Sequence, residues 1–162
     1  MVCYHFAMAH IHEKIDFTAS VFIVHGDKVL LHMHKKLGIW LQPGGHVELH
    51  EDPVQAVMRE AKEESGLDVE LAGKAPESLN TKFGARELMV PRYMNRHFFD
   101  EAHTHEHIDM VYFARAKSDA AVPEAEGGEV RWFTKEELAN PSLDLLPDVR
   151  KYALAAPEEL AE

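Results

Sequence analysis

The sequence predicts an α+β domain in which helices pack against a mixed β-sheet. Segments rich in β-forming residues precede one long amphipathic helix, and further strand and helix segments follow it. The chain has 162 residues, which is enough for one domain with a substantial core. No internal repeat and no linker rich in proline, glycine and serine divides the sequence. We therefore expect a single domain over residues 1–162, with its core at about 16–140 and an extension at each end.

The first predicted element is a β-hairpin. Residues 17–24 are apolar and rich in β-formers, residues 25–27 (His-Gly-Asp) are typical of a turn, and residues 28–34 continue as a second strand. Residues 38–41 then lead to a tight loop at Pro-Gly-Gly, residues 43–45.

A helix is predicted to begin at Pro53 and to run to about Ser65. Asp52 is a typical N-cap, and proline is favoured at the first helical position. Gly66 suits the left-handed residue that ends many helices. The spacing i, i+3, i+4 and i+7 predicts an apolar stripe that faces the core, formed by Val54, Val57, Met58 and Ala61.

The second half of the chain predicts three more strands and two more helices. The stretch from Gly73 to about Glu106 predicts no regular element, because its apolar residues occur only in short groups. The strands are expected at 68–71, 108–116 and 130–134, and the helices at 135–139 and between 147 and 156.

Composition excludes several classes of protein. The 17 basic residues against 28 acidic ones give a net charge of −11, which disfavours a long nucleic acid as a partner. No apolar run approaches the ~18 residues of a membrane span. The segment Met1–His12 lacks a signal-peptide pattern, and the lone Cys3 cannot form an internal disulfide. We therefore expect a cytoplasmic protein that is not attached to a membrane.

Three glutamates of the predicted helix form an acidic face beside the apolar stripe. Glu60, Glu63 and Glu64 stand at i, i+3 and i+4. At ~6 Å and an effective dielectric of ~20, each pair repels by roughly 3 kcal/mol. Arg59 and Lys62 offset part of this repulsion, and a hard divalent cation offsets it better. A solvated acidic face is the alternative explanation for the three glutamates taken alone.

The surrounding residues favour the cation. They form the pattern G-x5-E-x7-R-E-x2-E-E-x-G, with Ala61 and Leu67 at its two apolar positions. This pattern resembles the Nudix box, and all seven fixed positions match: Gly45, Glu51, Arg59, Glu60, Glu63, Glu64 and Gly66. The resemblance implies a loop–helix–loop on an α/β/α sandwich, the Nudix fold. It also implies metal-dependent hydrolysis of the pyrophosphate bond in a nucleoside diphosphate linked to another group.

The resemblance also assigns roles to individual residues. It implies that Mg²⁺ or Mn²⁺ is bound by Glu60, Glu63, Glu64 and the Gly44 carbonyl. Glu51 would hold a further ion or its water, and Arg59 would orient the carboxylates through salt bridges. The general base stays open between Glu63, Glu64 and, on a later loop, Glu126 or Glu129. Such cations neutralise phosphate charge and make a water molecule easier to deprotonate.

A second cluster of polar residues lies before the strand predicted at 108–116. His103, His105, His107 and Asp109 occupy alternate positions, so an extended chain would point all four to one face. They are consistent with a transition-metal site, with contact to substrate phosphate, or with an exposed polar strand end. We expect the substrate site to be lined by Gly45, His46, His107 and Asp109, and His32 and His34 are further candidates.

Two other functions remain as alternatives. The first is a non-hydrolytic Nudix-fold module that binds or senses nucleotides, which the complete set of glutamates disfavours. The second is an isopentenyl diphosphate isomerase, which would need a cysteine near the site, whereas Cys3 is far upstream of the box. The proline that marks ADP-ribose-specific relatives and the tyrosine that marks diadenosine-polyphosphate relatives are absent after the box, at 82–85, which disfavours those substrates without excluding them. The expected partner is a small phosphorylated nucleotide derivative. A homodimer is possible because relatives are often dimers.

Overall fold

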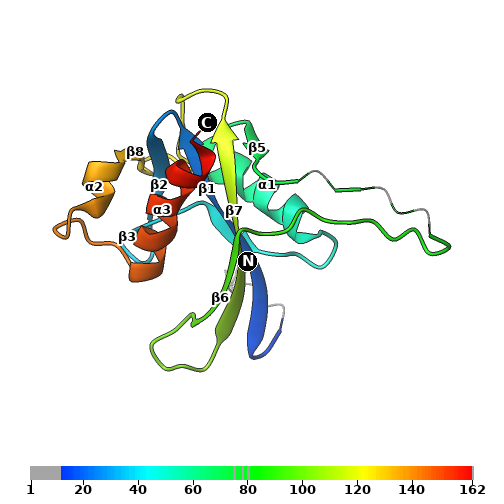
Figure 1. Ribbon diagram of the computed structural model, residues 1–162. Coiled ribbons are helices and arrows are strands. Elements are labelled where there is room, and N and C mark those ends of the chain that lie inside the picture. Colours follow the sequence, from blue (N-terminus) through cyan, green and yellow to red (C-terminus); the bar gives the residue numbers. More distant parts are fainter. Residues whose placement is uncertain (1–11, 75, 78, 80, 162) are drawn as a thin grey trace.

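The computed structural model describes residues 12–74, 76, 77, 79 and 81–161. Within this part of the chain, eight strands form one mixed sheet. Helices α1 and α3 lie on opposite faces of the sheet, which gives the predicted three-layer α/β/α sandwich (Figure 1). Cys3 lies outside the described residues. None of the described helices has the length and apolar character needed to span a bilayer.

The element bounds follow the sequence predictions closely, with two additional strands, β4 and β6, of which β4 lies where a tight loop was expected. The strands are β1 (Ile15–His25), β2 (Lys28–His34), β3 (Ile39–Leu41), β4 (Gly44–His46), β5 (Val69–Leu71), β6 (Tyr93–Phe98), β7 (Glu106–Ala116) and β8 (Val130–Thr134). The helices are α1 (Pro53–Ser65), α2 (Lys135–Ala139) and α3 (Pro147–Leu160).

Strand β1 is the centre of the sheet. One edge of β1 pairs antiparallel with β2 and β4, and the other edge pairs in parallel with β7. The register of the parallel pair sets Asp16 beside His107 and Thr18 beside Asp109. The antiparallel pair sets His46 of β4 beside Thr18. Residues about 90 positions apart in the chain therefore share one face of the sheet. In Figure 1 the starts of β1 and β7, together with β6, extend beyond the helices.

The two faces of the sheet carry separate hydrophobic cores. Phe22 and Phe113 point to the face covered by α3, where Val149 and Tyr152 are buried. Ile23, the next residue along β1, points to the other face and packs with Val57 of α1. This alternation follows from the period of two residues along a strand. Asp16, Thr18 and Ser20 lie an even number of residues before Phe22 on β1, so their side chains point to the same face, the one covered by α3.

Helix α1 confirms its predicted ends and corrects its predicted stripe. The Asp52 side chain accepts hydrogen bonds from the N–H groups of Val54 and Gln55, and Gly66 has φ of 69°. Met58 is 37% exposed, so its assignment to the buried stripe was wrong. The buried arc is instead formed by Ala56, Val57, Ala61 and Ser65. The helix is rotated about its axis so that Glu60 and Glu64, rather than Met58, face the sheet.

Two other elements differ from the sequence predictions. Strand β6 was not predicted, because most of its side chains are exposed and its apolar residues show no clear alternation. It forms through antiparallel pairing with β7, from Tyr93 with Val111 to Phe98 with Glu106. Helix α3 continues past Pro157 to Leu160. Tertiary contacts hold this last turn, since Tyr93 donates to Glu159 and Arg115 donates to the Leu160 carbonyl.

Candidate active site

Arg59 of α1 gathers three of the predicted carboxylates. Its Nη2 lies 2.6 Å from Glu51 Oε1, and its Nη1 lies 2.6 Å from Glu60 Oε1 and 3.1 Å from Glu63 Oε2. Nη2 also donates to the backbone carbonyl of His46 at 3.2 Å. The planar guanidinium can make these bonds together because its donors diverge at fixed angles. The site is therefore organised around one side chain that links α1 to the loop before it and to β4.

The carboxylates around Arg59 have different environments. Hydrogen bonding to Arg59 keeps the pKa of Glu51 below its ordinary value. Burial raises the pKa of Glu60 even though Arg59 acts in the opposite direction. The Glu63 side chain is 52% exposed, against 14% for Glu60. The burial of Glu60 leaves a negative charge that Arg59 does not fully compensate.

Two glycines allow the backbone of β4 to approach these carboxylates closely. A Cβ on Gly45 would stand 2.3 Å from Glu60 Oε1. A Cβ on Gly44 would stand 2.7 Å from Ser20 Cα of β1. The Gly44 N–H donates to Glu64 Oε2 at 2.9 Å. The Pro-Gly-Gly segment is therefore fixed by close packing on both sides of β4, and it brings a backbone donor to Glu64.

Glu64 stands apart from the Arg59 cluster. Burial raises its pKa to about 8, and repulsion from Glu60 and Glu124 acts in the same direction. His32 Nε2 lies 3.6 Å from Glu64 Oε2. Burial also lowers the pKa of His32 to about 4, so the imidazole is neutral near pH 7 and this contact is not an ion pair. Glu64 is therefore a largely buried carboxylate with little positive charge next to it.

A cavity of about 410 Å³ opens against Glu64. Its size is within the range of small-molecule sites. The end of β2 and the turn after it contribute His34, Lys35 and Lys36 to the lining, and the loop before β8 contributes Glu124 and Glu129. Glu129 was a predicted candidate base, whereas Glu126 is not among the lining residues. The two lysines and Glu124 were not predicted, because nothing in the sequence brings these segments to the helix.

The structure places the remaining predicted residues on the other face of the sheet. The His46 side chain turns toward Asp16, with Nε2 3.3 Å from Asp16 Oδ2. Asp109 is 5% exposed and accepts hydrogen bonds from Thr18 Oγ1 at 2.9 Å and Ser20 Oγ at 2.7 Å. Neither Asp109 nor His107 lines the cavity at Glu64. Their expected contact with substrate stays a prediction. Asp109 has hydrogen-bond partners within the sheet, whereas the His107 ring packs against the rings of His46 and His97.

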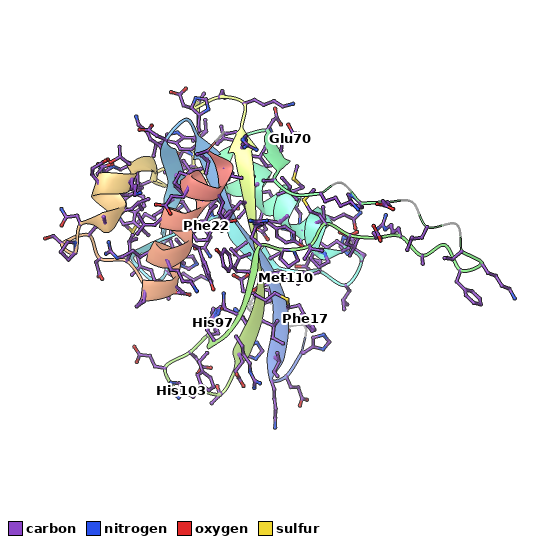
Figure 2. All side chains as sticks on the ribbon, in the orientation of Figure 1. Phe17, Phe22, Glu70, His97, His103 and Met110 are labelled. Atoms are coloured by element: carbon purple, nitrogen blue, oxygen red, sulfur yellow. The ribbon has the colours of Figure 1, made fainter. Side chains whose placement is uncertain are left out.

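His103 does not share the face of the other cluster residues. It has a φ of 55° and precedes β7, so the alternation that was expected from position 103 begins only at His105. Its ring stacks on Phe98, with centroids 4.1 Å apart. Figure 2 shows His103 at the far tip of the β6–β7 turn, beyond His97.

The donor set around α1 fits a hard divalent cation. Glu51, Glu60, Glu63 and Glu64 offer only oxygen atoms, which Mg²⁺ and Mn²⁺ prefer. Burial raises the pKa of both Glu60 and Glu64, so ionising both carboxyl groups together is costly, and a bound cation would offset that cost. The contact that the structure shows for Gly44 is through its N–H, and its predicted role as a carbonyl ligand remains a prediction.

Comparisons with known proteins agree with this geometry. The family model of the NUDIX domain matches residues 15–155. A hydrolase of the NUDIX family from Clostridium perfringens is 36% identical, with a TM-score of 0.76 over 90% of this chain and 97% of that chain. A MutT NUDIX hydrolase from Burkholderia pseudomallei is 25% identical, with a TM-score of 0.60 over 89% and 98%. No curated protein matched the chain.

A more distant structure shares the fold alone. An ADP-ribose pyrophosphatase from Streptococcus suis is 21% identical, with a TM-score of 0.53 over 91% of this chain and 92% of that chain. The family match spans most of the chain and includes the complete box from Gly45 to Leu67. The chain belongs to the Nudix hydrolase family.

Proposed function

We propose that the protein is a metal-dependent hydrolase that cleaves the pyrophosphate bond of a nucleoside diphosphate linked to another group. The observation that carries this proposal is the position of Glu64. It is a largely buried carboxylate, 16% exposed, that borders a cavity of about 410 Å³ and stands beside the carboxylates held by Arg59. A structural glutamate is seldom buried without a basic partner, because burial of a lone charge costs free energy.

The proposed ligands of the cation are Glu60, Glu63 and Glu64, with Glu51 as a further ligand or water-holding group. Mg²⁺ or Mn²⁺ bound there would neutralise negative charge on the phosphate oxygens of the substrate. Arg59 holds Glu51, Glu60 and Glu63 at fixed positions through its hydrogen bonds. The Gly44 N–H fixes one oxygen of the Glu64 carboxylate.

Glu64 is the better candidate of the two glutamates left open for the general base. It borders the cavity, whereas Glu63 is half exposed and bound to Arg59. In the metal-free site its pKa of about 8 leaves Glu64 largely protonated near pH 7, and a bound cation would favour the ionised form that can act as a base. We propose that the Glu64 carboxylate takes the proton of the attacking water.

Lys35 and Lys36 are the proposed contacts for the phosphate groups. Both line the cavity, on the side of β2. A protein with a net charge of −11 repels an anionic substrate at long range, so local positive charge at the entrance favours binding. Lys35 and Lys36 would therefore contact the phosphate charge, and a cation held by the carboxylates of α1 would neutralise part of it.

The test is hydrolysis of a substrate panel with Mg²⁺ or Mn²⁺. The panel contains nucleoside triphosphates, ADP-ribose, other nucleotide sugars and dinucleoside polyphosphates, with phosphatase coupling to detect the products. ADP-ribose is included because the distant relative from Streptococcus suis is named for that activity. We expect one class to exceed a kcat/KM of ~10⁴ M⁻¹s⁻¹ and to lose activity on chelation.

The variants Glu63→Gln and Glu64→Gln should each cost two or more orders of magnitude in kcat while the fold is retained. Glu70→Gln is the matched control, because Glu70 is an exposed glutamate on β5 (Figure 2). Activity of both site variants near that of the control would contradict the proposal. Tight nucleotide binding without turnover would instead favour the non-hydrolytic sensor.

A further inference from the structure

A second group of potential metal ligands lies on the opposite face of the sheet from α1. Asp16, His105 and His107 each offer one ligand atom, and these atoms lie within 4.8 Å of one another. Asp16 is fully buried, and the two histidines are each 6% exposed. The parallel pairing of β1 with β7 sets Asp16 beside His107. His105 lies directly before β7, two residues before His107, and so points to the same face. The group is therefore built by the sheet and does not depend on a surface loop.

His105 faces acceptors with both of its ring nitrogens. Nδ1 lies 3.4 Å from the Glu13 carbonyl oxygen, and Nε2 lies 3.1 Å from Asp16 Oδ2. A neutral imidazole donates from only one nitrogen, and the other nitrogen carries a lone pair. In one tautomer Nε2–H donates to Asp16; in the other Nδ1–H donates to the Glu13 carbonyl, and the Nε2 lone pair and Asp16 Oδ2 can both bind one cation. Metal-bound histidines typically donate their second N–H to an acceptor of this kind.

His107 supplies an independent indication of a ligand. Its Nε2 is buried and makes no hydrogen bond within the described part of the chain. Four rings lie around it, with centroids at 5.0 Å for His46, 5.5 Å for His97, 4.9 Å for Phe99 and 5.6 Å for His105. Burial and the neighbouring imidazoles lower the pKa of His107 to about 4, so the ring is neutral near pH 7. A neutral imidazole nitrogen is the form that binds metals.

The donor types indicate which metal fits. Two imidazole nitrogens and one carboxylate oxygen suit zinc, nickel or iron, whereas Mg²⁺ prefers oxygen alone. Ligands about 2.1 Å from a tetrahedral zinc ion lie about 3.4 Å from one another. The His105 Nε2 to Asp16 Oδ2 distance of 3.1 Å is close to that spacing. His46 Nε2, 3.3 Å from the same aspartate oxygen, lies beside the group.

We propose that Asp16, His105 and His107 form a second metal site that binds a divalent transition-metal ion of the zinc class. The site joins the start of β1 to the start of β7 on the α3 side of the sheet. It is separate from the oxygen-only set on α1, and β4 lies between them, with the His46 carbonyl bonded to Arg59 and its ring beside Asp16. The proposal does not depend on the hydrolytic activity.

The test uses the untagged full-length chain with Co²⁺ as a spectroscopic probe for the zinc site. Excess Mg²⁺ first saturates the carboxylates on α1, and Co²⁺ is then titrated while visible absorption is recorded. We expect one equivalent to give the intense bands of a low-coordinate site with nitrogen ligands, and Zn²⁺ to displace it. We also expect Zn²⁺ to raise the thermal unfolding temperature at this stoichiometry.

The variants His107→Asn and Asp16→Asn should each weaken Co²⁺ binding at least tenfold. Glu70→Gln and His103→Asn are the matched controls and should bind as the wild type does. His103→Asn removes an exposed imidazole from the same segment (Figure 2). Circular dichroism of each variant checks the fold, and His105→Asn replaces any variant that fails to fold.

Two results would overturn the proposal. One is a Co²⁺ spectrum that is unchanged in folded His107→Asn and Asp16→Asn proteins. The other is the absence of stoichiometric Co²⁺ or Zn²⁺ binding when Mg²⁺ is present in excess. In either case the group is a hydrogen-bonded part of the sheet and not a metal site.

Discussion

Replacement of Gly45 by alanine tests the proposed role of the carboxylate cluster most directly. The new Cβ would lie 2.3 Å from Glu60 Oε1 and 2.7 Å from Glu60 Cδ. Comfortable non-bonded contacts are about 3.5 Å, so the carboxylate must move by about 1 Å. Gly45 is not among the residues with positive φ, so an alanine can adopt its backbone conformation. The substitution therefore displaces Glu60 without straining β4.

The magnitude follows from this displacement. A misplacement of about 1 Å at a catalytic group costs on the order of 10²-fold in rate, which corresponds to about 2.7 kcal/mol of activation free energy. The clash is with the end of a flexible side chain, and a shift to another rotamer costs on the order of 1 kcal/mol. We expect Gly45→Ala to lower kcat/KM about 100-fold and the free energy of unfolding by no more than about 1.5 kcal/mol.

The assay combines steady-state hydrolysis of the best panel substrate, Mn²⁺ binding by electron paramagnetic resonance, and urea unfolding. Mn²⁺ affinity should fall together with kcat/KM. A double-mutant cycle with Glu60→Asp supplies the control. The shorter aspartate relieves the clash, so the double variant should be no worse than Glu60→Asp alone. Activity of Gly45→Ala within about threefold of the wild type would refute the reasoning.

Three further predictions concern the electrostatics of the two faces. In metal-free protein, the contribution of Glu64 to the free energy of unfolding should fall as pH rises from about 5 to 8, because native Glu64, with a pKa of about 8, stays protonated where the unfolded chain has ionised. His32 and His107, whose pKa values are lowered to about 4, act in the opposite direction below about pH 6.5. The free energy of unfolding of the wild type minus that of Glu64→Gln, measured by urea unfolding, should therefore fall across this range. Arg59→Lys should lower kcat by 10-fold or more, because an ammonium cannot replace the guanidinium bonds to Glu51, Glu60 and Glu63. Steady-state kinetics at saturating Mg²⁺ test this, and a kcat equal to that of the wild type would refute it. Asp109→Ala should lower the free energy of unfolding by about 1–3 kcal/mol, since two buried hydroxyls lose their acceptor. A raised KM with unchanged stability would instead indicate that Asp109 contacts substrate.

Local chemistry in the sequence determined the elements that carry the box. Asp52, Pro53 and Gly66 set the ends of α1 through capping, which acts within one helical turn. The spacing of the glutamates placed them on one side of that helix, and Arg59 indeed bonds three of the predicted carboxylates. The hairpin of β1 and β2 followed from a short turn between two β-rich segments.

Only the tertiary structure decided which of the other predicted site residues are exposed, which are buried and which lie on the opposite face of the sheet. Strand β6 exists because it pairs with β7, and its own residues show no clear alternation. Glu63 and Glu64 are neighbours in sequence, yet packing leaves one half exposed and buries the other beside a cavity. The parallel pairing of β1 with β7 carries Asp109 and His107 to the face opposite α1. Contacts between residues about 90 positions apart depend on strand register, which no local sequence pattern specifies.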